Sequence, residues 1–550
     1  MEGSHLPKSD NITAESSDAE QHRPAAAAAL LLDEELDRNV IKRRLSSDAS
    51  TNEKDAKKPR ESVPLRYIDP SIHLTTVQRA PAAHNMGCVF LESLIGDADL
   101  EFMVQINYMV DIDFIMAKVH ESIRDELRTI VYHGLRLTQD KLLRMETNTR
   151  LKYPNITLHR VPVPGIGTHH TKAMLLFYRD GAMQFVVHTA NMIEPDWRNK
   201  TQAVFTTGRL SKKPPSSALP TCAFERDLLE YLQCYHNSNG IVGRVSQYDF
   251  TDVRGVLIGS VPGKFTGLTK NKWGHLRLRT VLRQQVEIAK EHVLGSKIIC
   301  QISSVGSLGK ESQDWLRGEF EMSLNAHRNS NYMASSKGDF TVIYPTAENV
   351  RTSYDGWSMG GSLPFRSTSY NKQAHYMNPL LHSWRAIKSG RERSMPHIKT
   401  FTRVTSKAHG DYISWFLLTS ANLSKPAWGT MKNDVFAIQS YELGVLVFPG
   451  LFEDLNESGE SLQVYMMNAT VDDPYPEPLS PHPSSSDQGD QGEESDTNDD
   501  SKYTQHSIGV VPIRLPYDLP LKKYEFPRDQ VWLMDKYFQG MDDFGSTLDM

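Results

Sequence analysis

A long segment occurs twice in this chain, and this duplication limits the possible fold and function more than any other feature of the sequence. The copies span residues 167–197 and 396–428. Each opens with His-x-Lys, continues as an apolar run, passes through a glycine-containing turn and returns as a second apolar run. Each then reaches Ala-Asn, with a tryptophan six residues after the asparagine. The pattern predicts two strand hairpins of the same design.

The His-x-Lys tripeptide occurs only twice in the sequence, once at the start of each copy. One such tripeptide is weak evidence, because a side chain in an isolated copy is more often an ordinary surface residue of a strand. Side chains two apart on a strand share a face, so His170 lies beside Lys172, and His397 beside Lys399. The returning strand of each hairpin then brings its asparagine, Asn191 or Asn422, toward this pair.

Two such half-sites facing each other would present two imidazoles, two ammonium groups and two amides to one small anion. Cleavage of a phosphodiester needs a nucleophile, a proton donor for the leaving oxygen and donors to the non-bridging oxygens. Histidines can supply the first two roles, and lysines and asparagines the third. The sequence also lacks an H-E-x-x-H motif. We therefore expect a phosphodiesterase that uses no metal and no cofactor.

The two half-sites resemble the phospholipase D superfamily, in which one histidine forms a phosphohistidine and the other is the acid. Most of that superfamily has an aspartate five residues after the lysine, whereas this chain has Phe177 and Val404 there. An asparagine on each return strand instead resembles the tyrosyl-DNA phosphodiesterase branch. Other segments that resemble this branch are NYMVDIDF, GTHHTK, SSVGSLG, GGSLP, TSANLSKPAWG, SYELGVL and PYDLP.

The resemblance implies a role for each matching position. His170 resembles the nucleophile and His397 the general acid and base, while Lys172, Lys399, Asn191 and Asn422 would bind the phosphate. Gln202 and Glu442 resemble polar residues behind the active site, which would fix the imidazole tautomers. The positions that resemble a narrow groove for single-stranded DNA are Ser304, Ser307, Ser362, Ser424 and Lys425. Ile166 stands where the branch often has an aromatic residue available to stack on a base, so the resemblance leaves base stacking at this position open.

The expected fold is α/β, with two phospholipase D-like α-β-α sandwich domains related by a pseudo-twofold axis and the site between them. Residues 63–255 form the first expected domain and residues 256–550 the second. Residues 1–62 are expected to be a disordered tail, because they are rich in charged and small residues. A second disordered stretch, an acidic insert, is expected at 470–506.

The resemblance implies DNA with a 3′-phosphotyrosyl end, single-stranded or at a duplex end, as the substrate. The tyrosine would belong to a peptide left by a stalled type IB topoisomerase, and other 3′ blocking groups could also be removed. A general nuclease or a phospholipid phosphodiesterase on the same scaffold is the alternative. A non-catalytic DNA-binding descendant is a third reading, but it would have lost a histidine or lysine. We expect a monomer that does not bind a membrane.

Composition agrees with a soluble globular chain, with 39% hydrophobic residues and four widely spaced cysteines expected to be free thiols. The formal charge of −6 includes seven acidic and no basic residues between Ser484 and Ser501, so a basic groove elsewhere remains open. The apolar run at 25–32 is too short to cross a bilayer. Two basic clusters between Lys42 and Arg60 are typical of a bipartite nuclear signal, which predicts a nuclear protein; an ordinary charged tail is the alternative.

Overall fold

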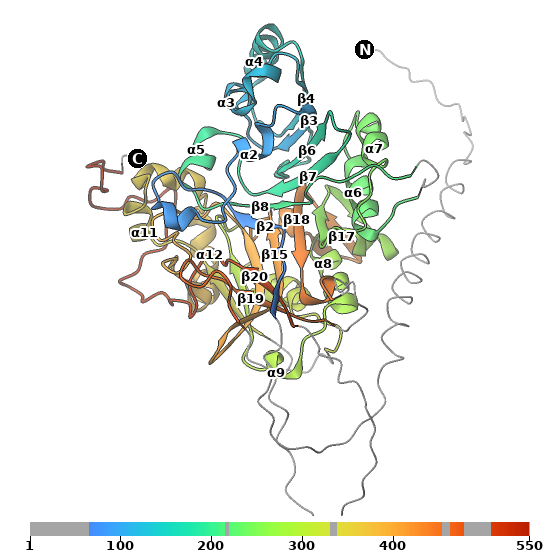
Figure 1. Cartoon of the computed structure of the whole chain (residues 1–550). Coiled ribbons are helices and arrows are strands. Elements are labelled where there is room, and N and C mark those ends of the chain that lie inside the picture. Colours follow the sequence, from blue (N-terminus) through green and yellow to red (C-terminus); the bar gives the residue numbers. More distant parts are fainter. Residues whose placement is uncertain (1–64, 215–218, 331–337, 454–461, 478–507, 549–550) are drawn as a thin grey trace, which may run out of the picture. The chain divides into compact units, whose positions relative to one another are not determined.

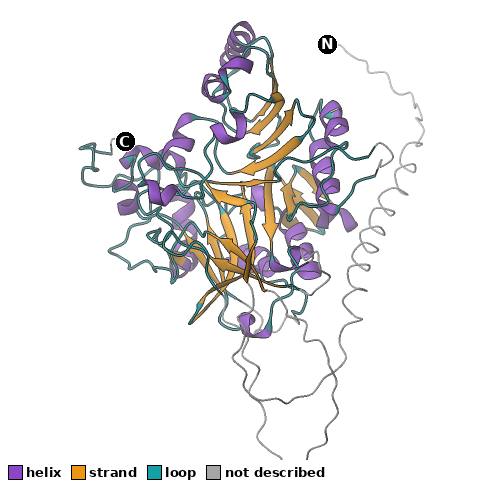
Figure 2. Cartoon of the chain, viewed as in Figure 1, coloured by secondary structure: helices purple, strands orange, loops and turns teal. Residues whose placement is uncertain are grey.

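The computed structural model describes residues 65–214, 219–330, 338–453, 462–477 and 508–548 (Figure 1). All of them belong to the compact unit of residues 63–550. Strands and helices are interspersed along this unit (Figure 2), which confirms the predicted α/β class. Its helices are α2 (Glu92–Ile95), α3 (Ile112–Lys118), α4 (Gln139–Lys152), α5 (Glu194–Arg198), α6 (Ala223–Gln233), α7 (Asn239–Val245), α8 (Gly274–Gln285), α9 (Lys290–Val293), α10 (Glu321–Leu324), α11 (Ala347–Arg351), α12 (Ser367–Met377) and α13 (Lys425–Trp428).

The first sheet has the strand order β2-β8-β7-β6-β3-β4-β5. Its central hairpin, β6 and β7, is the predicted hairpin of the first copy, and it turns at Asp180 and Gly181. Gly181 has φ of +88°, and the Asp180 carboxylate accepts a hydrogen bond from the Ala182 amide. The strands are β2 (Ile72–Leu74), β3 (Leu100–Asn107), β4 (Arg128–His133), β5 (Ile156–Arg160), β6 (Ala173–Tyr178), β7 (Met183–His188) and β8 (Ala203–Thr206).

The second sheet contains the hairpin of the second copy, β14 and β15, and its core has the order β9-β18-β15-β14-β11-β12-β13. Three further strands extend it through β15. The strands are β9 (Val256–Ser260), β11 (Lys297–Gln301), β12 (Asp339–Ile343), β13 (Leu381–His382), β14 (Thr400–Lys407), β15 (Gly410–Thr419) and β18 (Glu442–Val447), with β1 (Leu65–Tyr67), β19 (Gln463–Asn468) and β20 (Ile508–Ile513) as the extension. A small separate sheet holds β10 (Gly263–Phe265), β17 (Val435–Ile438) and β16 (Thr430–Lys432).

The two large sheets repeat the same topology. In both, the central hairpin is antiparallel, and the strand beside its first member is also antiparallel to it. Two further strands then continue in parallel on that side. On the other side, β2 and β8 in the first sheet correspond to β9 and β18 in the second, all antiparallel. The duplicated sequence is therefore the centre of a duplicated fold.

The expected domain boundary at residue 255 does not separate the strands of the two sheets completely. Strand β1, at the beginning of the described chain, pairs in parallel with β20 in the second sheet. Residues 470–477 of the expected insert are described, and Tyr475 lies with its ring 5.0 Å from that of Tyr67. The remainder of the insert and the whole of 1–62 lie outside the described residues.

Strand β6 is buried on both faces, and the core cluster on one of these faces continues into the second sheet. Leu175 and Phe177 join a cluster that also contains Leu417 of β15, while Met174 and Leu176 pack in a second cluster on the opposite face. Helix α6 supplies side chains to the first cluster and α3 to the second, so helices cover both faces of this sheet. A hairpin packed on both sides holds the residues at its ends in fixed places.

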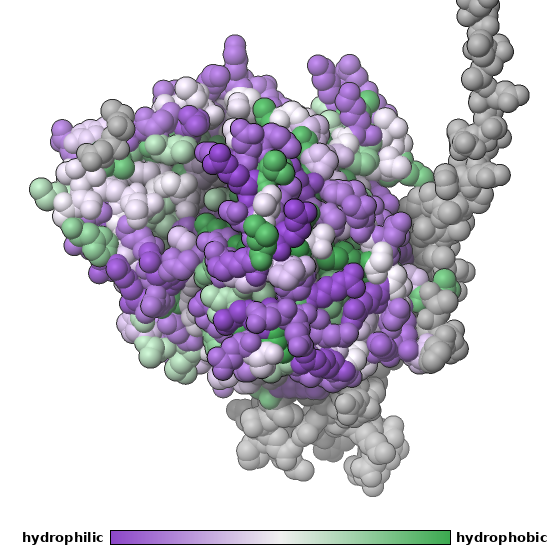
Figure 3. Space-filling model, turned by 90° about the horizontal axis from the view of Figure 1, so that it is seen from above, coloured by the Kyte–Doolittle hydropathy of each residue, from purple (hydrophilic) through white to green (hydrophobic). Residues whose placement is uncertain are grey.

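The face seen in Figure 3 is mainly hydrophilic, with apolar residues in small separate areas. This distribution is ordinary for a surface that contacts water. In the part of the chain that the structure describes, no helix has the length and apolar character needed to cross a membrane.

Candidate active site

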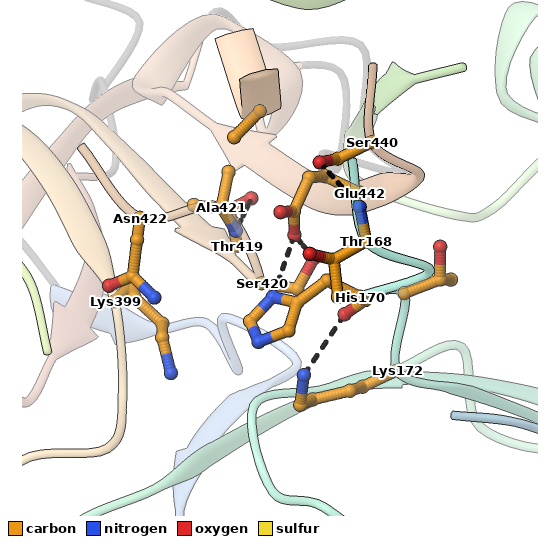
Figure 4. Close-up of polar contacts among 12 residues, drawn as sticks. Thr168, His170, Lys172, Lys399, Thr419, Ser420, Ala421, Asn422, Ser440 and Glu442 are labelled. Atoms are coloured by element: carbon orange, nitrogen blue, oxygen red, sulfur yellow. Dashed lines mark hydrogen bonds and ion pairs between the residues drawn. The ribbon is translucent and has the colours of Figure 1, made fainter. Parts of the chain in front are cut away.

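Each His-x-Lys tripeptide lies just before the first strand of its hairpin, rather than inside the strand as predicted. Lys172 and Lys399 immediately precede β6 and β14, and their side chains are fully buried. The Lys172 Nζ donates to the carbonyl oxygen of His170 at 3.0 Å, and Lys399 makes the same contact with His397. In Figure 4 the lysines and His170 point toward a common space. The two tripeptides therefore have the same local conformation.

The two halves exchange backbone contacts at these tripeptides. The His170 amide donates to the carbonyl oxygen of Tyr441 at 2.9 Å, and the His397 amide donates to that of Thr201 at 3.0 Å. Gly167 approaches the other half so closely that a Cβ there would lie 1.8 Å from the Gln439 carbonyl oxygen. A side chain at residue 167 would therefore displace the segment that carries His170.

Each histidine also receives its polar partner from the other half. The His170 Nδ1 lies 3.0 Å from the Glu442 Oε2, and the His397 Nδ1 lies 3.0 Å from the Gln202 Nε2. Gln202 and Glu442 occupy equivalent places in the repeat. Val204, two residues after Gln202, pairs with His188, and Gly444, two residues after Glu442, pairs with Thr419. His188 and Thr419 each stand three residues before the asparagine of their half-site. The partners are exchanged symmetrically, although one is an amide and the other a carboxylate.

A hydroxyl group orients each of these partners. The Ser420 Oγ donates to the Glu442 Oε2 at 2.5 Å, and the Thr189 Oγ1 donates to the Gln202 Oε1 at 2.7 Å. The carboxylate of Glu442 can only accept, so the Nδ1 of His170 carries the hydrogen and its Nε2 has a free lone pair. This is the tautomer that a nucleophilic histidine requires.

The asparagines differ more than the histidines do. The Asn422 Oδ1 accepts hydrogen bonds from the amides of Ser303 and Ser304 at 3.0 and 2.9 Å, which leaves its NH₂ group free to face the site. The side-chain Oδ1 of Asn191 is buried without a hydrogen-bond partner. The backbone N–H of Asn191 donates to the Asp196 Oδ2 at 2.7 Å. Asn422 is thus held by its side chain and Asn191 by its backbone.

Burial and positive charge together destabilise the charged forms of these groups. Burial lowers the pKa of Lys172 to about 8, and burial with Lys172 holds the pKa of Lys399 well below its ordinary value. Burial and Lys172 also lower the pKa of His170, against the opposing effect of Glu442. For His397, burial and Lys399 hold the pKa well below its ordinary value. An anion bound among these groups would relieve this repulsion, and a phosphodiester is such an anion.

Comparison with known proteins shows the family of this chain. A family model described as tyrosyl-DNA phosphodiesterase matches residues 71–525. The chain belongs to the tyrosyl-DNA phosphodiesterase family.

Among similar family members, tyrosyl-DNA phosphodiesterase 1 of Arabidopsis thaliana is 33% identical over 89% of this chain and 77% of its own length. The probable tyrosyl-DNA phosphodiesterase of Schizosaccharomyces pombe is 28% identical over 88% of this chain and 96% of its own. A crystal structure of the yeast tyrosyl-DNA phosphodiesterase covers 85% of this chain with a TM-score of 0.56 at 17% identity, and all of that chain is covered. The last comparison confirms the predicted fold. As a family member the chain is a phosphodiesterase, and the family acts on DNA.

The DNA-contact residues that the family resemblance implied come from three segments of the chain that contact one another. Segment 303–307 runs beside 422–425, because Val305 pairs with Leu423 in a parallel bridge and the Gly306 amide donates to the Leu423 carbonyl oxygen. Ser304, Ser307, Ser424 and Lys425 are therefore neighbours. Ser304 donates to the Pro364 carbonyl oxygen, Ser307 is exposed, and Ser424 caps α13. Ser362 stands two residues before Pro364, which Ser304 contacts, and its Oγ accepts a hydrogen bond from the Lys200 Nζ at 2.5 Å.

Ile166 is 73% exposed at the start of the family's Gly-Thr-His-His segment. Arg136 donates to the carbonyl oxygens of both Ile166 and Gly167. The isoleucine side chain is thus presented to solvent on a segment fixed by its backbone.

Sequence reasoning missed four side chains of the site in this chain, namely Thr189, Ser420, Asp196 and Lys200. Thr189 and Ser420 each stand two residues before the site asparagine, so comparison of the two copies could have found them. Asp196 and Lys200 gave no such signal, because Ala427 stands in the second copy where Asp196 stands in the first. Among the described residues, no group of three or more His, Cys, Asp or Glu side chains could hold a metal ion.

Proposed function

We propose that this chain hydrolyses the bond between a DNA 3′-phosphate and a tyrosine, as left by a stalled type IB topoisomerase, through a phosphohistidine at His170. The observation that carries the proposal is the exchanged pairing of the histidines. Glu442 leaves the Nε2 of His170 free to attack, while His397 has a different partner and is available for proton transfer. Family membership supplies the substrate class.

In the first step, the His170 Nε2 would attack phosphorus and form an N–P bond while the P–O bond to tyrosine breaks. A phenol has a pKa of about 10, so its oxygen needs a proton as it leaves at neutral pH. His397 would supply that proton from its Nε2. Lys172, Lys399 and the two asparagines would bind the non-bridging oxygens.

In the second step, the His397 Nε2 would take a proton from water, whose oxygen attacks phosphorus. The P–N bond then breaks, releasing a DNA 3′-phosphate and restoring His170 as a base. The proton gained by His397 replaces the one given to tyrosine, so both histidines return to their initial states. The same two steps would serve other 3′ blocking groups.

A DNA strand would reach the site by lying over Ser304, Ser307, Ser362, Ser424 and Lys425. These hydroxyl groups contact phosphates without reading bases. We further propose that the chain acts as a monomer, with a topoisomerase-derived peptide as the leaving group. Residues 63–255 and 256–550 would be its two domains, since the repeated strand order begins anew at β9.

Activity should survive chelation, because two lysines occupy the place that metal charge would fill. The test is release of tyrosine from a 3′-phosphotyrosyl oligonucleotide with excess EDTA, run beside hydrolysis of phosphatidylcholine and of an unmodified oligonucleotide. We expect turnover of the first substrate alone at a rate that EDTA does not change. Loss of activity in EDTA and its return with a divalent ion would contradict the mechanism, and faster lipid hydrolysis would contradict the substrate.

We also propose that the protein is nuclear, on the strength of the basic clusters between Lys42 and Arg60, which lie outside the described residues. Deleting residues 42–60 should move a fluorescent fusion to the cytoplasm and leave the activity in vitro unchanged, because tails contribute little to a folded core. A fusion that still accumulates in the nucleus would show these clusters to be an ordinary charged tail.

A further inference from the structure

Asp196, on helix α5, is a buried carboxylate behind the proposed acid. It is 1% exposed, and its Oδ2 lies 3.3 Å from the Nδ1 of His397. The same oxygen accepts a hydrogen bond from the backbone N–H of Asn191 at 2.7 Å, and the Oδ1 accepts one from the Lys200 Nζ at 2.5 Å. These contacts fix the carboxylate beside the ring. In the described part of the chain, Asp196 is the acidic residue within ion-pair distance of His397.

Gln202, the other partner of His397, is oriented as a donor. Its Oε1 is engaged by the Thr189 hydroxyl, and its Nε2 lies 3.3 Å from the Asp196 backbone carbonyl oxygen, which can only accept. The NH₂ group therefore faces the Nδ1 of His397 at 3.0 Å. An NH₂ group can serve a ring nitrogen that has a lone pair, but not one that carries hydrogen.

A general acid, however, must hold a second proton. Before His397 gives the Nε2 proton to the leaving oxygen, the ring is an imidazolium and its Nδ1 carries hydrogen as well. Gln202 cannot accept that hydrogen in its present orientation, whereas the Asp196 Oδ2 can. The Nδ1 thus has a donor for the neutral ring whose hydrogen is on Nε2, and an acceptor for any form of the ring that carries hydrogen on Nδ1.

We infer that Asp196 is a positioning residue for the proposed reaction: it accepts the Nδ1 hydrogen of His397 when the ring carries two protons and also after the Nε2 proton has left, when the Nε2 must be free to take a proton from water. The inference rests on the proposed function, since it assumes that His397 is the acid. The charged and titratable groups that oppose this protonated state are Lys399, Lys200, Lys172 and His170. The carboxylate of Asp196 opposes the effect of these groups and favours the protonated form of His397.

The repeat supports a role confined to one histidine. The position of Asp196 in the first copy is occupied by Ala427 in the second, so the His170 side has no carboxylate from this helix. His170 instead meets the strand carboxylate of Glu442. A residue needed only to support the hairpin should occur in both copies, whereas a residue serving the acid should occur in one.

Two substitutions should move the pH profile in opposite directions. Activity requires protonated His397, so it is lost as pH rises through the pKa of that group. Asp196→Asn removes a negative charge and should move this alkaline limb to lower pH by about one unit. Lys200→Gln removes a positive charge, keeps N–H donors for Asp196 and Ser362, and should move the limb to higher pH.

The experiment measures kcat and KM from pH 5 to 10 for both variants, with a 3′-phosphotyrosyl and a 3′-nitrophenyl oligonucleotide. Asp196→Asn should lower kcat about 100-fold on the first substrate and less than about tenfold on the second, whose leaving group needs little help. KM should change little in either case. His397→Ala serves as the reference for complete loss of the acid.

Equal losses on both substrates, or limbs that move in the same direction, would overturn the role of Asp196. If Asp196→Asn fails to fold, Lys200→Gln alone decides: an unmoved limb contradicts the inference. The proposed function fails differently, because then the wild-type chain would not release tyrosine, or His397→Ala would not discriminate between the leaving groups.

Discussion

The two half-sites are built by the same strands in the same order, yet they hold their histidines with different chemistry. On one side the partner is the carboxylate of Glu442, oriented by Ser420. On the other side it is the amide of Gln202, oriented by Thr189. A carboxylate keeps hydrogen on the Nδ1 of His170, which suits a nucleophile. An amide leaves the charge state of the other ring to its surroundings, which suits an acid.

The comparison also shows how a repeat can become asymmetric at small structural cost. Both halves have three features in common. The histidine backbone amide donates to the other half, the lysine Nζ donates to the carbonyl oxygen of the histidine, and a hydroxyl group orients the polar partner. Glutamate and glutamine have nearly the same shape, so their exchange changes the charge beside a histidine without changing the packing. Two similar halves can therefore perform opposite steps of one reaction.

The largest expected effect comes from removing either histidine. His170→Ala should be inactive toward both phosphotyrosyl and nitrophenyl oligonucleotides, because no nucleophile remains. His397→Ala should lose at least about 100-fold on phosphotyrosyl DNA, since the phenol then leaves without a proton. The measurement is single-turnover product formation by gel electrophoresis.

The two histidine variants should also differ in whether a covalent DNA–protein adduct accumulates. His397→Ala should react once with the nitrophenyl substrate and then stop, because no base activates water, so an acid-labile DNA–protein adduct accumulates. Adduct in His170→Ala instead would reverse the two roles. Absence of adduct from both variants would favour direct attack by water.

An intermediate effect is expected from exchanging the partners. Glu442→Gln should reduce kcat by about 10- to 100-fold, because the carboxylate that orients His170 is lost. Glu442 raises the pKa of His170 against burial and Lys172. The nucleophile must be unprotonated, so activity is lost as pH falls through this pKa. Removing the carboxylate should therefore move the acidic limb of the kcat/KM profile to lower pH.

Gln202→Glu is the matched control, since it places a carboxylate beside His397 and should move the alkaline limb upward instead. A profile in which both substitutions moved the same limb would mean that the two partners do not serve separate histidines.

The smallest effect concerns the asparagines and is on stability. Asn422→Ala leaves the amides of Ser303 and Ser304 without their acceptor and should lower the free energy of unfolding by about 1–3 kcal/mol. Asn191→Ala removes an oxygen that has no partner and should change that free energy by less than about 1 kcal/mol. Urea unfolding of both variants tests the difference, and equal losses would contradict the contrast between the half-sites.

The sequence by itself determined the hairpins, the α/β class and the two His-x-Lys sets. These depend on short-range periodicity and on a repeat, both of which are visible along the chain. The family resemblance added the division of roles between the histidines and the DNA-contact positions, which stay predictions. The strands begin just after the lysines rather than at the histidines. The His170 backbone amide donates to the Tyr441 carbonyl oxygen in the other half instead of to a strand of its own sheet.

The tertiary structure alone decided which partner faces which histidine. Glu442 is 272 residues from His170 and Gln202 is 195 residues from His397, so no local pattern relates them. Asp196 could not be found from the repeat, because its place in the second copy is an alanine. The low pKa values of the lysines likewise arise from burial between two sheets. Contacts between distant segments follow from packing of the whole core, which short-range sequence patterns do not specify.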